Sequence, residues 1–127
     1  MLDKIKLENV LFLDIETVPE HKKFDELSPI KQKLWEEKSA YKRRYDSKNG
    51  EEISAEEYYA HAGIWAEFGK IICISVGYFT TVKDNERQFR IKSYYGDDEK
   101  ELLENFADLL NTYFSKSNKL ICGHNIK

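Results

Sequence analysis

The sequence has only two cysteines, two prolines and six glycines in 127 residues. It also lacks any apolar run near the ~20 residues of a membrane-spanning helix, so no span is predicted. The first residues are charged and lack the apolar segment of a signal peptide. Without an export signal, the cysteines are expected to be reduced thiols in a cytoplasmic protein.

A basic excess is missing too. Lys and Arg total 20 and Asp and Glu total 23, which gives a formal net charge of −3. This balance excludes a surface that is cationic all over and grips nucleic acid everywhere, but it allows a local strand-binding groove. The 41% hydrophobic, 34% charged and 13% aromatic residues are typical of one globular domain rather than of a disordered chain.

The order of the predicted elements indicates a mixed α/β sheet. Residues 10–13 form an unbroken apolar run, typical of a strand buried on both faces. Strands are also predicted at residues 71–79, 87–94 and 120–122, the second and third as a hairpin. The last strand is expected to lie parallel to the first, because a helix connects it to the hairpin. Asp98 caps this helix, whose apolar stripe is Leu102, Leu103, Phe106, Leu109, Leu110, Tyr113 and Phe114.

Residues 20–66 are predicted to form a helical insertion after the first strand. Ser28 followed by Pro29 is typical of a helix start, and Ser54 with Glu57 forms a capping box that opens a second helix. The tyrosines and tryptophans of the insertion are expected to lie in a core, although one or two could stack on bases. A solvated helix face, rather than a phosphate-binding one, is expected for the basic cluster of Lys38, Lys42, Arg43, Arg44 and Lys48.

Two carboxylates follow the first predicted strand. Asp14 and Glu16 are two residues apart, so in an extended chain their side chains point to the same side. Such a pair is repulsive unless a cation lies between the two groups, and Mg²⁺ or Mn²⁺ prefers oxygen ligands of this kind. Open α/β sheets also bind ligands at the carboxyl ends of their strands. The pattern predicts a divalent-metal site; the alternative is the solvated start of a loop.

Other kinds of site have less support. No glycine-rich phosphate-binding loop follows the acidic strand end, which argues against a Walker-type nucleotide hydrolase. No nucleophile elbow is present, although a Ser-His-Asp arrangement stays open. The three histidines lack the spacing of zinc ligands. Cys73 and Cys122 lie in apolar strand segments and are expected to be buried packing residues.

Two motifs carry a resemblance to a known family. Residues 10–17 read Val-Leu-Phe-Leu-Asp-Ile-Glu-Thr, which resembles the first motif of the DEDD 3′–5′ exonucleases in the form found in family B DNA polymerases. Residues 123–127 read Gly-His-Asn-Ile-Lys, which resembles the opening of the second motif. The hairpin and helix between them come in the order of the ribonuclease H-like fold. The chain is therefore similar to the N-terminal portion of a polymerase-B-like 3′–5′ exonuclease domain.

The resemblance implies hydrolysis of a single-stranded nucleic acid from its 3′ end with two Mg²⁺ or Mn²⁺ ions. Asp14 would bridge both ions, and Glu16 would hold the ion that activates the attacking water. Thr17 and Asn125 would position the terminal nucleotide. No membrane partner and no sequence preference are expected.

Two of the four carboxylates of the family pattern are not among residues 1–127. The Asp of the second motif would follow Lys127, and the third motif, with a Tyr and an Asp, is absent from the sequence. Residues 1–127 are therefore expected to be the N-terminal part of one domain that is incomplete at its C-terminus. The full-length protein is expected to be active, and residues 1–127 alone are expected to be inactive.

Two other functions stay open. One is a ribonuclease H-like module that binds nucleic acid or a protein without cutting, which is the expectation for residues 1–127 alone. The other is a phosphatase of the haloacid dehalogenase type, whose strand ends in Asp-x-Asp. Glu16 is longer than the second Asp of that pattern and Thr17 comes one residue early, which argues against the phosphatase.

Overall fold

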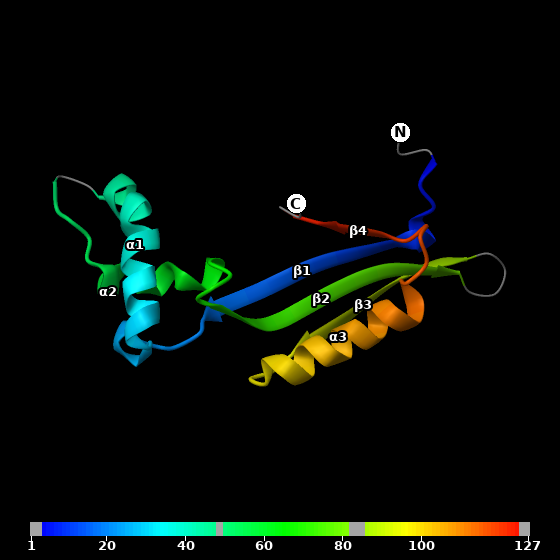
Figure 1. The fold of residues 1–127 in the computed structure, drawn as a ribbon. Coiled ribbons are helices and arrows are strands. Elements are labelled where there is room, and N and C mark those ends of the chain that lie inside the picture. The colour runs from blue at the N-terminus through cyan, green and yellow to red at the C-terminus, as the bar shows by residue number, and fades with distance from the viewer. Residues whose placement is uncertain (1–3, 48–49, 82–85, 125–127) are drawn as a thin grey trace. The chain divides into compact units, whose positions relative to one another are not determined.

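A computed structural model describes residues 4–47, 50–81 and 86–124 (Figure 1). The chain divides into two compact units: the first comprises Met1–Glu16 and Ile71–Lys127, and the second comprises Thr17–Lys70. Within the described ranges, no helix has both the length and the apolar character that a membrane crossing requires.

The strands form one four-stranded mixed sheet in the order β3-β2-β1-β4 (Figure 1). Strands β2 and β3 pair antiparallel and β1 and β4 pair parallel, as the sequence predicted. The class of mixed α/β sheet is thereby confirmed. The strands are β1 (Val10–Pro19), β2 (Gly69–Thr81), β3 (Arg87–Tyr95) and β4 (Leu120–Gly123).

Helix α3 (Glu99–Tyr113) packs on one face of the sheet (Figure 1). Its predicted cap is confirmed, because Asp98 Oδ1 accepts a hydrogen bond from the backbone N–H of Glu101 at 3.1 Å. The buried core between helix and sheet consists of Leu11, Ile74, Val76, Tyr94, Leu102 and Leu109. Two residues of the predicted stripe lie outside this contact: Leu103 is 40% and Tyr113 65% exposed.

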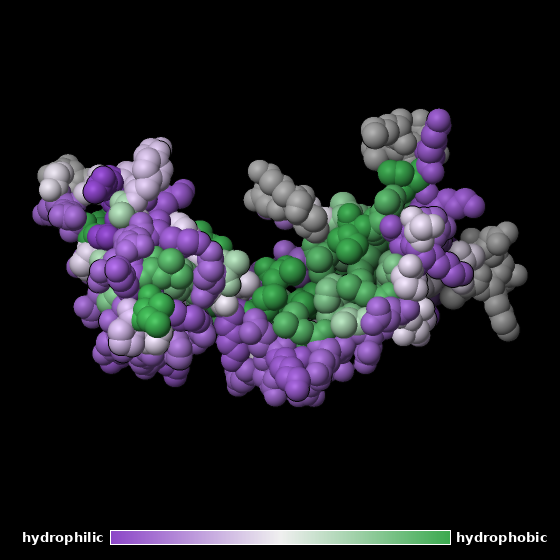
Figure 2. Space-filling model, in the orientation of Figure 1, coloured by the Kyte–Doolittle hydropathy of each residue, from purple (hydrophilic) through white to green (hydrophobic). Residues whose placement is uncertain are grey.

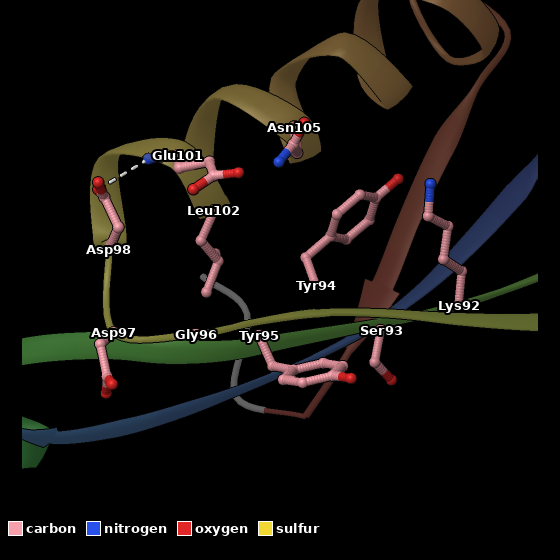
Figure 3. A pocket seen from close by; sticks show the side chains of 10 residues that line it. All are labelled: Lys92, Ser93, Tyr94, Tyr95, Gly96, Asp97, Asp98, Glu101, Leu102 and Asn105. Atoms are coloured by element: carbon pink, nitrogen blue, oxygen red, sulfur yellow. Dashed lines mark hydrogen bonds between the residues drawn. The ribbon is translucent and has the colours of Figure 1, made fainter.

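Strand β3 shows how the two faces of the sheet differ. Lys92 and Tyr94 point to the side that carries α3, whereas Ser93 and Tyr95 point to the other side (Figure 3). Phe89 and Ile91 of β3 lie on that second side, where they are 47% and 72% exposed. We call the side of the sheet opposite α3 the open face. The predicted alternation in β3 is confirmed, but its apolar side is the one without the helix.

Hydrophobic residues of β1, β4 and α3 are also exposed. Figure 2 shows a hydrophobic patch over the part of the sheet between β4 and α3. The exposed hydrophobic residues of β1, β4 and α3 include Ile15, Leu103, Leu120 and Ile121.

The second unit begins its helices where the sequence predicted. In α1 (Pro29–Asp46), Ser28 Oγ accepts a hydrogen bond from Lys31 N at 3.4 Å. In α2 (Ala55–Tyr58), Ser54 Oγ accepts from Glu57 N at 3.1 Å, and the Glu57 carboxylate accepts from Ser54 N at 3.0 Å. This reciprocal pair is the predicted capping box. Helix α2 has only four residues and continues as a 3-10 helix, Tyr59–Ile64.

Trp35 is the centre of the core of the second unit. Its side chain is fully buried, and its indole Nε1–H donates a hydrogen bond to the carbonyl of Ala55 at 2.8 Å. Its ring packs edge-on against Tyr59, Trp65 and Phe68, with centroids 5.6, 5.7 and 5.1 Å away. The expectation that aromatic residues of the insertion form a core is therefore confirmed for these side chains.

Candidate functional site

Strand β1 leaves the core at the point where its acidic residues begin. Val10 and Leu11 are buried, but Asp14 and Glu16 are exposed. Both lie within the strand, so its alternation places their side chains on the same side as Phe12, on the open face. Neither carboxylate has an ion pair or hydrogen bond with another residue of the described ranges. The predicted carboxylate pair is thus exposed to solvent and available to a ligand.

A shallow groove of about 400 Å³ lies on the open face, and Asp14 lines it. Its walls are almost entirely apolar, which means that Asp14 is one of its few polar groups. The rings of Phe12 and Phe89 meet edge-on in the groove at a centroid distance of 5.9 Å. The other lining residues are Leu13, Ser75, Val76, Gly77, Ile91, Cys122, Gly123 and His124.

Strand β4 brings His124 to this groove. The parallel register pairs Leu13 with Gly123, the last residue of β4, so Asp14 of β1 and His124 just beyond β4 are the next residues along the two chains. Both line the same groove. The sequence predicted no role for His124, because neither zinc-ligand spacing nor a nucleophile elbow pointed to it. The missed signal was the parallel pairing, which it did predict and which brings the ends of the two strands together.

Thr17, one of the two predicted substrate-binding residues, does not line this groove, and the other, Asn125, lies outside the described residues. Thr17 belongs to the second unit, where it is exposed and lines a pocket of about 230 Å³ with Val18, Pro19 and residues of the 3-10 helix, His61 among them.

The donor chemistry of the acidic pair fits a hard divalent cation. Asp14 and Glu16 offer carboxylate oxygens, the ligands that Mg²⁺ and Mn²⁺ prefer. The number of donors is small, because the described part of the chain contains no group of three or more His, Cys, Asp or Glu side chains arranged to hold a metal. These residues could therefore supply only part of a coordination shell, and the remaining ligands would have to come from water or from further residues.

The cysteines are not arranged for metal binding or for a disulfide. Cys73 is half-buried and Cys122 is exposed, and both are free thiols. Their predicted burial is wrong for Cys122, because β4 is an edge strand whose four residues are all exposed.

A second pocket, of about 400 Å³, lies between the end of β3 and the first turns of α3 (Figure 3). Three acidic residues line it, but Asp98 already accepts the capping hydrogen bond of α3. Lys92, also in the lining, lies over the ring of Tyr94 at 4.5 Å. Two of its charged groups are thus engaged at the start of α3 and within β3, and nothing in its geometry indicates a chemical role.

No family model matches the chain, and no match was found among curated proteins or solved structures. A functional assignment therefore has to rest on the residues and geometry described above.

Proposed function

We propose that residues 1–127 are the N-terminal part of a ribonuclease H-like 3′–5′ exonuclease domain that, at full length, shortens single-stranded nucleic acid from its 3′ end. One observation carries the proposal. Asp14 and Glu16 lie exposed on one side of β1, a central strand of the sheet, just beyond its buried residues. Two neighbouring carboxylates without a cationic partner repel each other and add no packing. A cationic ligand is therefore the best explanation for their position.

The topology supports the same proposal. Strand β2, which pairs antiparallel with β3, lies on one side of β1, and the parallel strand β4 lies on the other. Helix α3 covers one face of this sheet. The segment that opens the second motif of the resemblance begins at Gly123, the last residue of β4, and Gly123 and His124 line the same groove as Asp14. The first motif thus lies in β1, and the second begins at the end of the neighbouring strand β4.

In this function, Asp14 and Glu16 would hold Mg²⁺ or Mn²⁺. When bound, the metal lowers the pKa of a coordinated water and neutralises charge on the phosphodiester. The other residues of the groove have binding roles. Phe12, Phe89 and Ile91 offer an apolar surface to the sugar and base of the terminal nucleotide. The side chain of His124 offers a hydrogen-bonding group at the rim.

A second function follows from the small number of donors. Two carboxylates hold a divalent ion weakly, and the described residues contain no group of three donors. For residues 1–127 by themselves we therefore propose binding of nucleic acid without cleavage. The remaining carboxylates of the resemblance would have to be supplied by residues after Lys127.

The test uses the full-length protein and a 5′-labelled single-stranded oligonucleotide. With Mg²⁺ or Mn²⁺ we expect stepwise shortening from the 3′ end and no shortening in EDTA. Asp14→Asn and Glu16→Gln should each reduce the rate by about 100-fold or more, because each removes a metal ligand. Glu104→Gln, which removes an equal charge from the exposed side of α3, should leave the rate unchanged.

Three results would count against the proposal. The first is a rate for Asp14→Asn within a few-fold of the wild type. The second is covalent phosphate trapped on Asp14, which would indicate the phosphatase instead. The third is digestion by residues 1–127 alone, which would contradict the need for further carboxylates.

A further inference from the structure

Helix α1 has one face in the core and one in solvent. Trp35 and Ser39 are fully buried. On the opposite side Ile30 is 82%, Tyr41 75% and Tyr45 77% exposed. At about 100° per residue, Tyr41 and Tyr45 lie close together along one line on the helix surface, about 6 Å apart along its axis.

These two tyrosines differ from the other large aromatic residues of the second unit. Trp35, Tyr58, Tyr59, Trp65 and Phe68 all pack ring against ring in its core. Tyr41 and Tyr45 make no ring contact and no hydrogen bond with any residue in the described part of the chain. Two exposed rings one helical turn apart add nothing to the core, so a structural role does not account for them.

The same part of α1 is locally cationic in a chain of net charge −3. Residues 38–45 contain Lys38, Lys42, Arg43 and Arg44 and no acidic residue, a local charge of +4. Two of the four are engaged. Lys38 forms an ion pair with Glu67, and the Arg43 guanidinium donates to Ser39 Oγ and to the carbonyls of Ile53 and Glu36.

Lys42 and Arg44 remain available. Both are exposed, and neither has a hydrogen bond or ion pair with a residue that the structure describes. Helical geometry places them on opposite flanks of the line through Tyr41 and Tyr45, each about 80° from it. Glu37 lies near the same line, but Lys33 offsets its charge at 4.0 Å. The result is a pair of aromatic platforms with a cation on either side.

We propose that this face of α1 binds single-stranded nucleic acid. Bases stack on the rings of Tyr41 and Tyr45, and Lys42 and Arg44 contact the phosphates on either side. Stacking is tolerant of sequence because every base has a flat face. The inference rests on the proposed function in taking the bound strand to be the substrate. An acidic protein segment would use the two cations but would gain little from the rings.

The test measures binding of a fluorescein-labelled oligo(dT) to the full-length protein by fluorescence anisotropy in EDTA, where the strand stays intact. Tyr41→Ala and Tyr45→Ala should each weaken binding about tenfold. Tyr41→Phe and Tyr45→Phe should bind like the wild type, because the ring is retained. Replacing Lys42 or Arg44 with Gln should lower the slope of log affinity against log salt by about 0.7 each.

Matched controls come from the other unit. Tyr113→Ala removes a tyrosine of similar exposure from α3, and Lys100→Gln removes an exposed cation from the same helix; both should bind within twofold of the wild type. Circular dichroism and thermal melting verify that each variant is folded. Affinity within twofold of the wild type in Tyr41→Ala/Tyr45→Ala overturns the inference. So does full competition by poly-glutamate that is unchanged in that double variant, because it indicates an acidic protein partner.

The two proposals fail separately. Binding that depends on Tyr41 and Tyr45 in a protein that never cleaves the strand supports the binding face and rejects the exonuclease. Metal-dependent cleavage with no loss of binding in the tyrosine variants rejects the binding face alone. Asp14→Asn should slow cleavage by about 100-fold or more without weakening oligo(dT) binding in EDTA, where no metal is held.

Discussion

The ring of Phe89 lies against the backbone of Gly77 on the open face of the sheet. A methyl group on the Gly77 Cα would come within 2.4 Å of Phe89 Cζ, closer than carbon atoms approach. Glycine at this position leaves room for the end of the ring, which also meets Phe12 and Phe79, at 5.9 and 4.8 Å between centroids. The floor of the groove beside Asp14 thus depends on residue 77 being a glycine, which has no side chain.

Gly77→Ala should therefore destabilise the protein by about 1 kcal/mol, although alanine in a strand is otherwise favoured over glycine by about 0.5–1 kcal/mol. The ring must swing toward solvent and lose its contact with Phe12. In a Phe89→Leu background the same substitution should cost less, because a smaller side chain leaves room for the methyl group. Urea unfolding of the four proteins measures both effects. Equal costs in the two backgrounds would show that Phe89 is not the cause.

Arg43 and Arg44 are neighbours in sequence, but we expect their replacement by lysine to change the free energy of unfolding by different amounts. Arg43 makes three hydrogen bonds from its guanidinium, at 3.1, 2.9 and 3.2 Å, and ties α1 to the segment that contains Ile53. Lysine keeps the charge but cannot reach three acceptors with one ammonium group. Arg43→Lys should lower the free energy of unfolding by about 1–2 kcal/mol. Arg44→Lys should change it by less than about 0.5 kcal/mol.

Thermal or urea unfolding distinguishes the two lysine variants. Similar losses in both would mean that the hydrogen bonds of Arg43 add no stability beyond that of a surface charge. No loss in either would lead to the same conclusion.

Local signals in the sequence predicted the element starts well. The caps at Ser28, Ser54 and Asp98 are confirmed because a capping hydrogen bond joins residues three apart and needs no tertiary partner. The parallel pairing of β1 with β4 was also predictable, because a helix between two strands constrains their direction.

Which face of an element is buried was harder to predict, because it depends on distant partners. The tyrosines of residues 20–66 were expected in a core, which is wrong for Tyr41 and Tyr45: both are exposed, and the buried side of α1 carries Trp35 and Ser39. The choice is made by the ring cluster from residues 58–68, which no local pattern in α1 records. Likewise, β3 turns Tyr94 to α3 and its apolar Phe89 to the open face.

The candidate site residues differ in the same way: two were predictable from local geometry, and one depends on distant pairing. Asp14 and Glu16 were identified from a spacing of two within one strand, which local geometry explains. The position of His124 beside Asp14 comes from the register of two strands more than a hundred residues apart in sequence. A single sequence does not contain that register, since β4 is short and exposed on every residue.

Alkaline pH should destabilise the second unit. The pKa of Tyr58 is raised by the hydrogen bond from its hydroxyl to the Asp46 carboxylate, and the pKa of Tyr59 is raised chiefly by burial. Both folded-state values lie above the unfolded value near 10, so the folded form binds these protons more tightly. The resulting stability is complete below about pH 10 and is lost as the pH rises through the raised values.

The measurement is the melting temperature between pH 8 and pH 12. The double variant Tyr58→Phe/Tyr59→Phe removes both ionisations and should show a shallower fall, although it starts from a lower melting temperature. Tyr41→Phe, which removes an exposed hydroxyl, should follow the wild type. A fall of equal steepness in the double variant would assign the alkaline effect to other groups.

The acidic pair on β1 should make metal and stability interdependent. Without a cation, Asp14 and Glu16 repel one another, so Asp14→Asn should stabilise the protein by a few tenths of a kcal/mol at low salt. With Mn²⁺ at about ten times its Kd, the wild type should gain about 1.4 kcal/mol through binding to the folded state, while Asp14→Asn gains nearly none. The order of stability then reverses, which a surface pair without a ligand does not produce. Melting curves in EDTA and in MnCl2 measure the reversal, with Glu104→Gln as the control that should follow the wild type in both. A wild-type melting temperature that Mn²⁺ leaves unmoved, or moves equally in Asp14→Asn, would mean that these carboxylates are solvated residues at a strand end and hold no ion.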